Sequence, residues 1–483
     1  MRKHTAQYFK LAILTVLITC ALSVSGCGKT ENADNPYANL DTSGFHVGYD
    51  IHMGSNLLFI PNYFGEVYGV DSKYEDAIDA WGDLDYATAE TNLLEVEEAI
   101  EKSENHYYPD DIAFVKEALG LLYYDMAAYD KAYDNLLDAY VTMDDLYGNK
   151  KNLASGEQFY PQAIGIALCH YYYTIGDYDR CLKEIQSIRD DYEAVSEDSG
   201  EFSDYQLFIN TMLNDIEASI YKDRGEYEKA HDLYDENIEA CRENSKSGED
   251  SSLGSILGID ACTHMADCFS SFTTDSELAE KVDSYYDLAL TILDGFGDGD
   301  LRDKKKSEVL LKKGWYLTHF SDMQEEGRNL LEEAVSMQEK LYESGKKTPD
   351  IVDAYVKSAE LYGFVDNDLE KALEYYDKAL DLAETVYGEN HPKTAMVYES
   401  LGRFYGNRMN DVDQAIEYFN NGVDIYNNLL IENNVQMAGM YLQLAGCHKM
   451  KGENEISDEY LKKAYDMWGK LGIHVLQTDG TLK

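Results

Sequence analysis

Two cysteines of the chain, Cys169 and Cys181, have a spacing that could support redox chemistry. They lie twelve positions apart, and other parts of the chain carry a small residue such as Ala or Gly at the corresponding positions. If the two positions face each other on paired helices, the thiols could form a disulfide in an oxidising compartment, worth roughly 3 kcal/mol of stability. Alternatively, both cysteines are small apolar packing residues.

Motifs for catalysis are missing from the sequence. It has no His-Glu-x-x-His pair, no nucleophile elbow and no Gly-rich nucleotide loop. The segment 294–300, DGFGDGD, resembles the start of a calcium loop, but Phe296 replaces one ligand and Lys305 replaces the closing glutamate. We therefore interpret it as a turn. We expect no enzyme activity, no cofactor and no metal site.

The first residues predict export and lipid attachment. Arg2, Lys3 and Lys10 precede an apolar run over 11–24, which is typical of a secretory signal. The junction VSGC at 24–27 resembles a bacterial lipobox, and this resemblance implies that Cys27 receives a diacylglycerol and becomes the mature N-terminus. The alternative is a signal anchor that keeps its helix, but the run is shorter than the ~20 apolar residues that a span needs. We expect an extracytoplasmic protein that is lipid-anchored to a bacterial membrane.

Most of the chain consists of a repeat. A small residue recurs every 43–49 positions in a helical pattern, at Gly120, Cys169, Ala218, Ala266, Gly314, Ala359, Gly402 and Ala445. A second small residue follows each by about a dozen positions, and a bulky side chain comes four positions later. Within 354–383 the two small residues lie on the apolar faces of two predicted helices, so the backbones can approach closely. Periods of this length indicate stacked helical hairpins.

These units resemble tetratricopeptide repeats (TPRs), whose pattern runs small-x-x-aromatic, a Gly turn, and Ala-x-x-x-aromatic-x-x-Ala. The last three are similar to the long repeats of kinesin light chain: LEKALEYYDKALDLAETVYGENHPKTAMVYESLGRFYG, residues 369–406, has the Gly-x-x-His-Pro link. The resemblance implies an all-α, right-handed superhelical solenoid of eight to nine helix-turn-helix units. That family tends to carry asparagine where it grips a peptide backbone, whereas this chain has Lys357, Ser400 and Gln443.

The sequence divides into five segments. The signal peptide covers 1–26, and a polar, lipidated, flexible tether covers 27–45. Residues 46–109 contain an aromatic stretch, which either packs on the first helices or docks in the solenoid groove, and a degenerate capping unit. The solenoid covers 110–475 and a tail covers 476–483.

The charge limits the partners. With 41 Lys and Arg against 91 Asp and Glu, the formal charge is −50. Nucleic acid needs a basic surface and is not expected to bind. Contact with an anionic bilayer should depend on the lipid alone. The negative charge favours a basic partner. Alternatively, the acidic residues only keep the protein soluble.

The concave face is the expected binding site. It should be formed by the first helix of each unit, with the residues one and four positions after the first small residue pointing inward. Candidate contacts on that face are Tyr124, His170, Tyr173, Trp315 and Arg403. Aromatic anchors such as Trp315 dominate many interfaces, although this tryptophan could instead pack between units. The sequence favours a scaffold that binds a protein or peptide in this groove. The alternative is a solute receptor for a small molecule or a glycan.

Overall fold

The fold is given by a computed structural model of the chain. It describes residues 70, 72–103, 109–148, 160–196, 203–246, 252–270, 276–296, 299–320, 323–344 and 350–473. The predicted signal peptide, Cys27, the tether and the aromatic stretch up to residue 69 lie outside these ranges, as do residues 474–483. Within the described ranges, no helix has both the length and the apolar character needed to cross a membrane.

The regular elements in the described residues are all helical. They are α3 (Lys73–Gly82), α4 (Tyr86–Glu101), α5 (Pro109–Asp125), α6 (Tyr129–Tyr147), α7 (Tyr160–Thr174), α8 (Tyr178–Ser196), α9 (Ser203–Asp223), α10 (Tyr227–Lys246), α11 (Ser252–Ser270), α12 (Ser276–Asp294), α13 (Asp300–Leu317), α14 (Gln324–Glu343), α15 (Asp350–Glu360), η3 (Leu361–Asp366), α16 (Leu369–Tyr387), α17 (Pro392–Phe404), η4 (Tyr405–Met409), α18 (Val412–Asn428), α19 (Val435–Met450) and α20 (Asn454–Leu471). Consecutive α-helices pair as hairpins, from α3–α4 to α19–α20. The prediction of an all-α TPR superhelix is confirmed.

The two columns of small residues lie where the paired helices meet, and both are buried in every unit. In the α13–α14 hairpin a Cβ on Gly314 would lie only 2.9 Å from the Gly327 carbonyl oxygen, so a larger residue would separate the helices. The bulky residue four positions after the second column fills the space beside this contact. Tyr234, Tyr286 and Tyr376 in that position are at most 1% exposed. The sequence period therefore follows from the helix contact.

Two hairpins accommodate an extra residue in a π-turn. In α13–α14, α15–α16 and α17–α18 the small residues are 13 positions apart, one more than in α5–α6 or α7–α8. In α15–α16 and α17–α18 the first helix ends in a π-turn, η3 or η4, which absorbs the added residue. Each π-turn is followed by an asparagine in the left-handed region, Asn367 with φ 60° and Asn410 with φ 54°, a conformation that asparagine tolerates. The helix contact keeps its register as a result.

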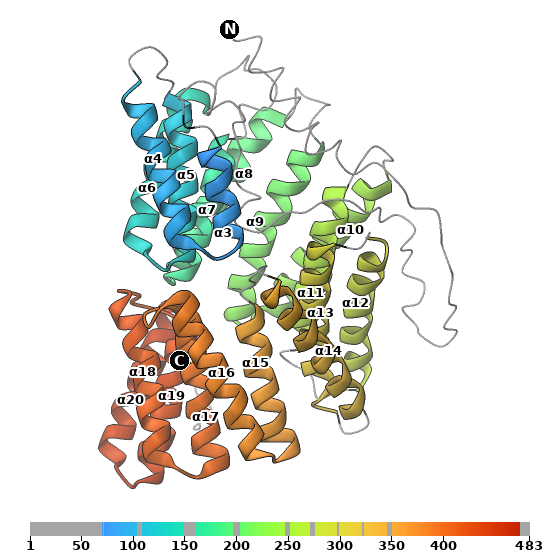
Figure 1. Cartoon of the computed structure of the whole chain (residues 1–483), viewed down its shortest axis with the longest axis vertical. Helices are drawn as coiled ribbons and strands as arrows, with labels where there is room; N and C mark the ends of the chain where they lie inside the picture. Colours follow the sequence, from blue (N-terminus) through green and yellow to red (C-terminus); the bar gives the residue numbers. More distant parts are fainter. Residues whose placement is uncertain are drawn as a thin grey trace.

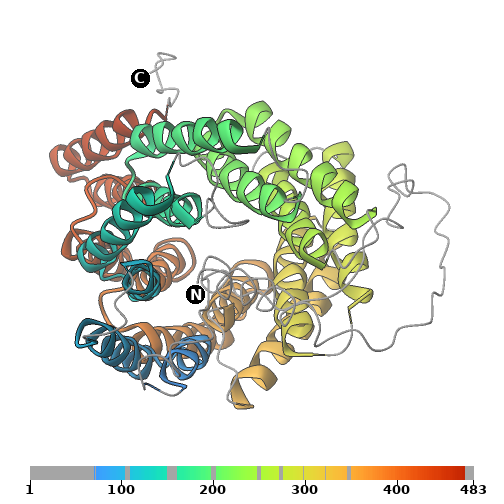
Figure 2. The same cartoon turned by 90° about the horizontal axis from the view of Figure 1, so that it is seen from above.

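The superhelix closes on itself after one turn. Figure 1 shows α3–α7 stacked above α16–α20, and Figure 2 shows the helices running around a common centre. One hydrophobic core contains buried residues from α3 to α9 together with residues of α18, α19 and α20. The N-terminal and C-terminal hairpins are therefore packed against each other, although some 250 residues separate them in sequence.

Among the described residues, three contacts between the two ends each bring the turn of an N-terminal hairpin against a C-terminal segment, either a link between hairpins or the end of α20. His391 Nε2 donates to the backbone oxygen of Asp125 at 3.0 Å. Arg224 Nε donates to the Leu471 carbonyl oxygen, also at 3.0 Å. In the third, Gly176 lies so close to Asn433 that no Cβ would fit. We call these six residues the closing contact: Asp125, Gly176, Arg224, His391, Asn433 and Leu471.

Candidate functional site

The first helices of six hairpins carry a continuous series of charged and hydrogen-bonding side chains. We call this series the inner row, and its members come from α7, α9, α11, α13, α15 and α17: His170, Asp215, Asp260, His264, Asp267, Lys305, Glu308, Lys312, Trp315, Asp350, Asp353, Lys357, Glu360, Lys393, Ser400 and Arg403. Apart from Glu360, the members that form ion pairs within the row are 14–39% exposed. They are held by neighbouring units yet remain open to a partner.

A regular contact between units builds part of the row. The residue two positions before the small column of one unit touches the residue one position after the small column of the preceding unit. Lys312 pairs in this way with Asp267 at 3.0 Å. Lys357 Nζ lies 4.5 Å from the centre of the Trp315 ring as a cation–π contact. The same rule places Ser400 against Glu360, described next.

Glu360 is the most buried acid of the row. Its side chain is 4% exposed and accepts three hydrogen bonds, from Ser400 Oγ at 2.7 Å, Arg403 Nη2 at 2.6 Å and Lys357 Nζ at 2.8 Å. Burial alone would raise the pKa of this carboxyl, but Lys357 and Arg403 outweigh burial and lower it. Glu360 is therefore ionised at neutral pH and connects α15 with α17.

Toward the N-terminus the row contains two histidines on either side of one carboxylate. His264 Nδ1 lies 2.6 Å from Asp215 Oδ1. Burial opposes protonation of His264, but Asp215 outweighs burial and raises the pKa of the imidazole. Burial lowers the pKa of His170 on α7, and Asp215 opposes that shift only in part. Of the two, His264 is the one favoured to carry charge near neutral pH.

The centre of the row holds ions of both signs. Lys305 Nζ lies 2.6 Å from Asp260 and 3.8 Å from Glu308, and Lys312 lies 3.1 Å from Glu308. Burial works against ionisation of Glu308, but the two lysines prevail and lower its pKa to about 2. Asp350 is half-buried, and partial loss of water together with the Glu308 charge raises its pKa to about 6.

The predicted inward-facing residues fall into two groups. Trp315 and Arg403 belong to one connected set, because Lys357 contacts both the tryptophan ring and the Glu360 carboxylate that binds Arg403. Trp315 also packs against an apolar cluster formed by its own hairpin, α13–α14, and the following one. His170 lies at the other end of the row, beside Asp215.

The two predicted tyrosines bridge neighbouring units. The Tyr124 hydroxyl and Thr174 Oγ1 lie 2.6 Å apart, and the Tyr173 hydroxyl donates to Asp223 Oδ2 at 3.0 Å. Tyr173 also stacks on Tyr178, with ring centres 5.5 Å apart. Both hydroxyls thus already have partners within the fold. A role in partner binding for the five predicted residues remains a prediction.

Sequence reasoning missed several members of the row. Asp267 and Glu360 occupy the column that also contains His170, Trp315 and Arg403, one position after the small residue. His264 and Lys312 occupy the column that contains Lys357 and Ser400. Reading both columns through all units would have identified these residues. Lys305 and Asp350 lie nine positions before the small column, as Lys393 does, and Glu308 lies six positions before it, as Asp260 and Asp353 do. These offsets, too, are repeated between units.

Cys169 and Cys181 meet as the spacing predicts. Both are fully buried at the centre of the α7–α8 hairpin, and the structure holds them as free thiols. Cys181 Sγ lies 3.2 Å from the Cys169 carbonyl oxygen. Contact with Cys181, together with burial, raises the pKa of the Cys169 thiol well above its usual value. The disulfide remains a prediction. In the described part of the chain no group of three His, Cys, Asp or Glu side chains could hold a metal ion.

Comparison with known proteins agrees with this fold. Residues 350–428 match the tetratricopeptide repeat family. No curated protein sequence matches the chain. A Rap protein solved in complex with competence and sporulation factor is similar in structure, with a TM-score of 0.51 at 12% identity, over 83% of this chain and 98% of that chain.

Two further solved structures are more distant. The apo form of the quorum sensor NprR from B. thuringiensis has a TM-score of 0.47 at 14% identity, over 83% of this chain and 98% of its own. A kinesin light chain protein with TPR-like repeats from Podosopora anserina has a TM-score of 0.33 at 16% identity, over 44% of this chain and 95% of its own. The comparisons thus show a tetratricopeptide repeat match within residues 350–428 and a fold shared with the Rap structure.

Proposed function

We propose that the chain is a membrane-tethered, extracytoplasmic scaffold that binds a protein or peptide along the inner row and has no turnover of its own. The observation that carries this proposal is the row itself. It runs through six consecutive hairpins, and its ions and hydrogen-bonding groups are held in fixed positions by neighbouring units. Preorganised donors and acceptors of this kind lose little entropy when a partner binds.

The Rap structure supports a ligand-binding role only by analogy. That protein was solved with competence and sporulation factor bound, and its fold is shared by this chain. We propose that this chain also takes a polypeptide ligand. The identity of that ligand need not be related, since one fold serves many functions.

The inner row defines the charge of the proposed partner more closely than the net charge does. Six cationic groups of the row pair with six carboxylates: His264, Lys305, Lys312, Lys357, Lys393 and Arg403 with Asp215, Asp260, Asp267, Glu308, Asp353 and Glu360. The field of a chain with net charge −50 would attract a basic partner over a distance. The row itself offers both signs, so we propose a basic partner whose bound segment also carries acceptors. Nucleic acid is not proposed as a partner.

Affinity capture with matched variants tests the site. Wild-type protein, Arg403→Ala and Trp315→Ala are each used as bait in detergent-solubilised cells. Lys378→Ala serves as the control, because Lys378 is 43% exposed on α16, a second helix. We expect one protein to bind the wild type and the control but neither inner-row variant. A partner bound equally by all four baits would place the site elsewhere, and a captured small molecule without protein would favour the solute receptor.

The proposed tether is tested separately. The basic leader and the junction ending in Cys27 support lipid attachment and an extracytoplasmic location. In cells fed a labelled fatty acid, we expect wild-type protein to take up label and to sediment with membranes. Cys27→Ser should lose both properties. Labelled Cys27→Ser protein would contradict the lipid anchor without affecting the inner-row proposal.

A further inference from the structure

The α9–α10 hairpin differs from the other hairpins in one buried position. Seven residues after the second small column, the other units carry Ala, Ile or Gly, and those residues are buried: Ala139, Ile188, Ala289, Ala334, Ala379, Gly422 and Ala464. In α10 this position is Asn237, which is 2% exposed. An amide at a site that elsewhere packs helix against helix opposes stability unless its polar atoms are paired. Such local exceptions concentrate at functional sites.

A network of amides surrounds Asn237. Its Nδ2 donates to the Thr211 carbonyl oxygen at 3.1 Å, and its Oδ1 accepts from Asn214 Nδ2 at 2.9 Å. Arg189 Nη2 in turn donates to Asn214 Oδ1 at 2.6 Å. The amide planes of Asn214 and Asn237 are therefore fixed before any ligand arrives.

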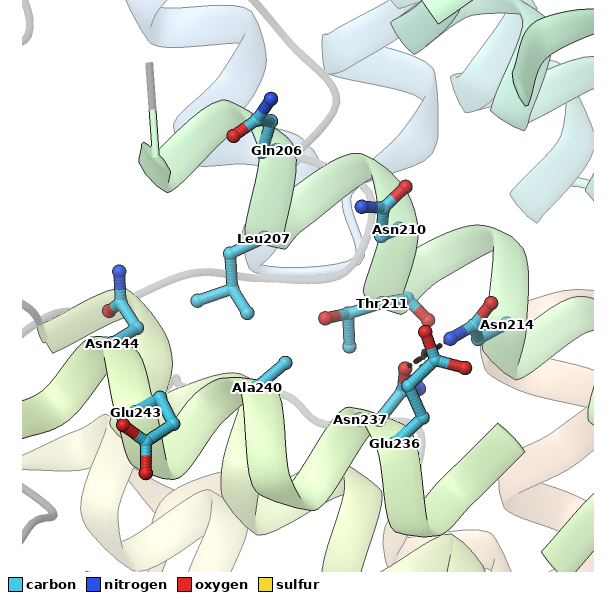
Figure 3. A pocket seen from close by; sticks show the side chains of 10 residues that line it. All are labelled: Gln206, Leu207, Asn210, Thr211, Asn214, Glu236, Asn237, Ala240, Glu243 and Asn244. Carbon is cyan, nitrogen blue, oxygen red and sulfur yellow. Dashed lines mark hydrogen bonds between the residues drawn. The ribbon is translucent and has the colours of Figure 1, made fainter. Parts of the chain in front are cut away.

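The network forms one end of a pocket of about 370 Å³, at the small end of the range for ligand sites. Figure 3 shows the pocket between α9 and α10, with the bond between Asn214 and Asn237 drawn as a dashed line. Amide, hydroxyl and carboxylate side chains dominate the lining, and two apolar residues complete it: Gln206, Asn210, Thr211, Asn214, Glu236, Asn237, Glu243 and Asn244, with Leu207 and Ala240.

The chemistry of the lining excludes some ligand classes. No Lys, Arg or His is among the lining residues that the structure describes, and Glu236 and Glu243 are exposed. An anion would meet the exposed carboxylate of Glu236, and no cationic side chain among the described lining residues would offset that repulsion. Amide side chains carry both donors and acceptors, which suits a neutral molecule dense in hydroxyl groups. Leu207 and Ala240 provide an apolar surface for its carbon skeleton.

From these observations we propose that the α9–α10 pocket binds a neutral saccharide the size of a mono- or disaccharide. This site is distinct from the inner row and goes beyond the proposed function. Asn210 and Asn237 hydrogen-bond the sugar hydroxyls, and Asn214 holds Asn237 in place.

Titration of the full-length protein with glucose, galactose and maltose, followed by calorimetry and saturation-transfer NMR, tests the proposal. Glucose 6-phosphate is the charged comparison. We expect at least one neutral sugar to bind, and Asn237→Ala and Asn210→Ala each to weaken it about tenfold, the effect of one or two lost hydrogen bonds. Asn237→Ala restores the residue of most other units, and Asn210 is exposed, so both variants should fold.

Asn135→Ala, which removes an exposed amide on α6, is the control and should bind as the wild type does. Circular dichroism verifies that all variants keep their helix content. Three results would each overturn the proposal: no binding of any of the three neutral sugars, unchanged affinity in both pocket variants, or equally tight binding of glucose 6-phosphate.

Discussion

The closing contact can be tested with two glycines that share a backbone conformation but not an environment. Gly176 and Gly225 lie in the turns of the α7–α8 and α9–α10 hairpins, and each has φ 76°. Their left-handed conformation agrees with the sequence prediction of a glycine turn at both places. Alanine at either position therefore costs about the same, roughly 1 kcal/mol, for adopting this conformation.

Only Gly176 lies against the other end of the superhelix. A Cβ there would overlap the Asn433 carbonyl oxygen and would lie 2.8 Å from its carbon and 3.0 Å from Leu471 Cδ2, whereas the nearest atom at Gly225 is 3.9 Å away. The obstructing Asn433 atoms are backbone, so the two ends must separate to relieve the overlap. Overpacking of this kind costs about 1–3 kcal/mol. We expect Gly176→Ala to destabilise the protein by about 2–4 kcal/mol and Gly225→Ala by about 1 kcal/mol.

Solution scattering and hydrogen exchange measure the separation directly. We expect Gly176→Ala to have a larger radius of gyration than the wild type and Gly225→Ala. Amides near Asp125 and His391 should also exchange faster in Gly176→Ala, because these residues share the closing contact. Equal dimensions and equal stability of the two variants would refute the closed superhelix and leave only the backbone effect.

Three further predictions concern buried groups. Burial lowers the pKa of His391 to about 4, so the neutral form of His391 stabilises the fold above pH 6.5. That stability, about 3 kcal/mol, is lost as the pH falls toward 4. His391→Asn retains a capping acceptor, so its free energy of unfolding in denaturant should lack this pH-dependent component, and a pH profile like that of the wild type would contradict the prediction. Glu360→Ala removes the common acceptor of Lys357 and Arg403, whose side chains are 32% and 39% exposed and can regain water, so we expect a loss of about 2 kcal/mol of folding stability. The control, Glu374→Ala on the exposed face, should lose less than about 0.5 kcal/mol. Equal unfolding midpoints for the two variants would show that Glu360 is dispensable. If Cys169 and Cys181 are bridged, both should resist alkylation after unfolding without reductant, whereas full labelling would identify them as packing residues.

The helices were predictable because the signal is local. The small residue, its partner about a dozen positions later and the bulky side chain after it are all set by one helix–helix contact, repeated in each hairpin. The same regularity placed Trp315 and Arg403 on the correct helices, since the inner row follows fixed offsets from the small column. Reading that offset through every unit would have added Asp267 and Glu360.

Other features depend on contacts between distant parts of the chain, which the sequence repeat does not encode. The bond between His391 and Asp125 joins residues 266 positions apart, and no motif links the two. The GENHP sequence at 388–392 indicated only a link between units, yet His391 both caps α17 through Nδ1 and reaches the N-terminal half through Nε2. Asn237 was overlooked for the opposite reason. A single polar residue in an otherwise apolar column does not stand out as a functional signal in the sequence, because its hydrogen bonds are visible only in the structure.

Closure of the superhelix changes how its terminal units should behave. In an open linear array each unit touches only its neighbours, so the end units have half the usual contacts and fray first. Here the turns of the α5–α6, α7–α8 and α9–α10 hairpins rest on C-terminal units, so units that are far apart in the chain also touch each other. Loss of the last unit therefore breaks two interfaces instead of one. Unfolding should then be more cooperative than in an open solenoid, and the contacts between distant residues should form late in folding because they close the longest loops.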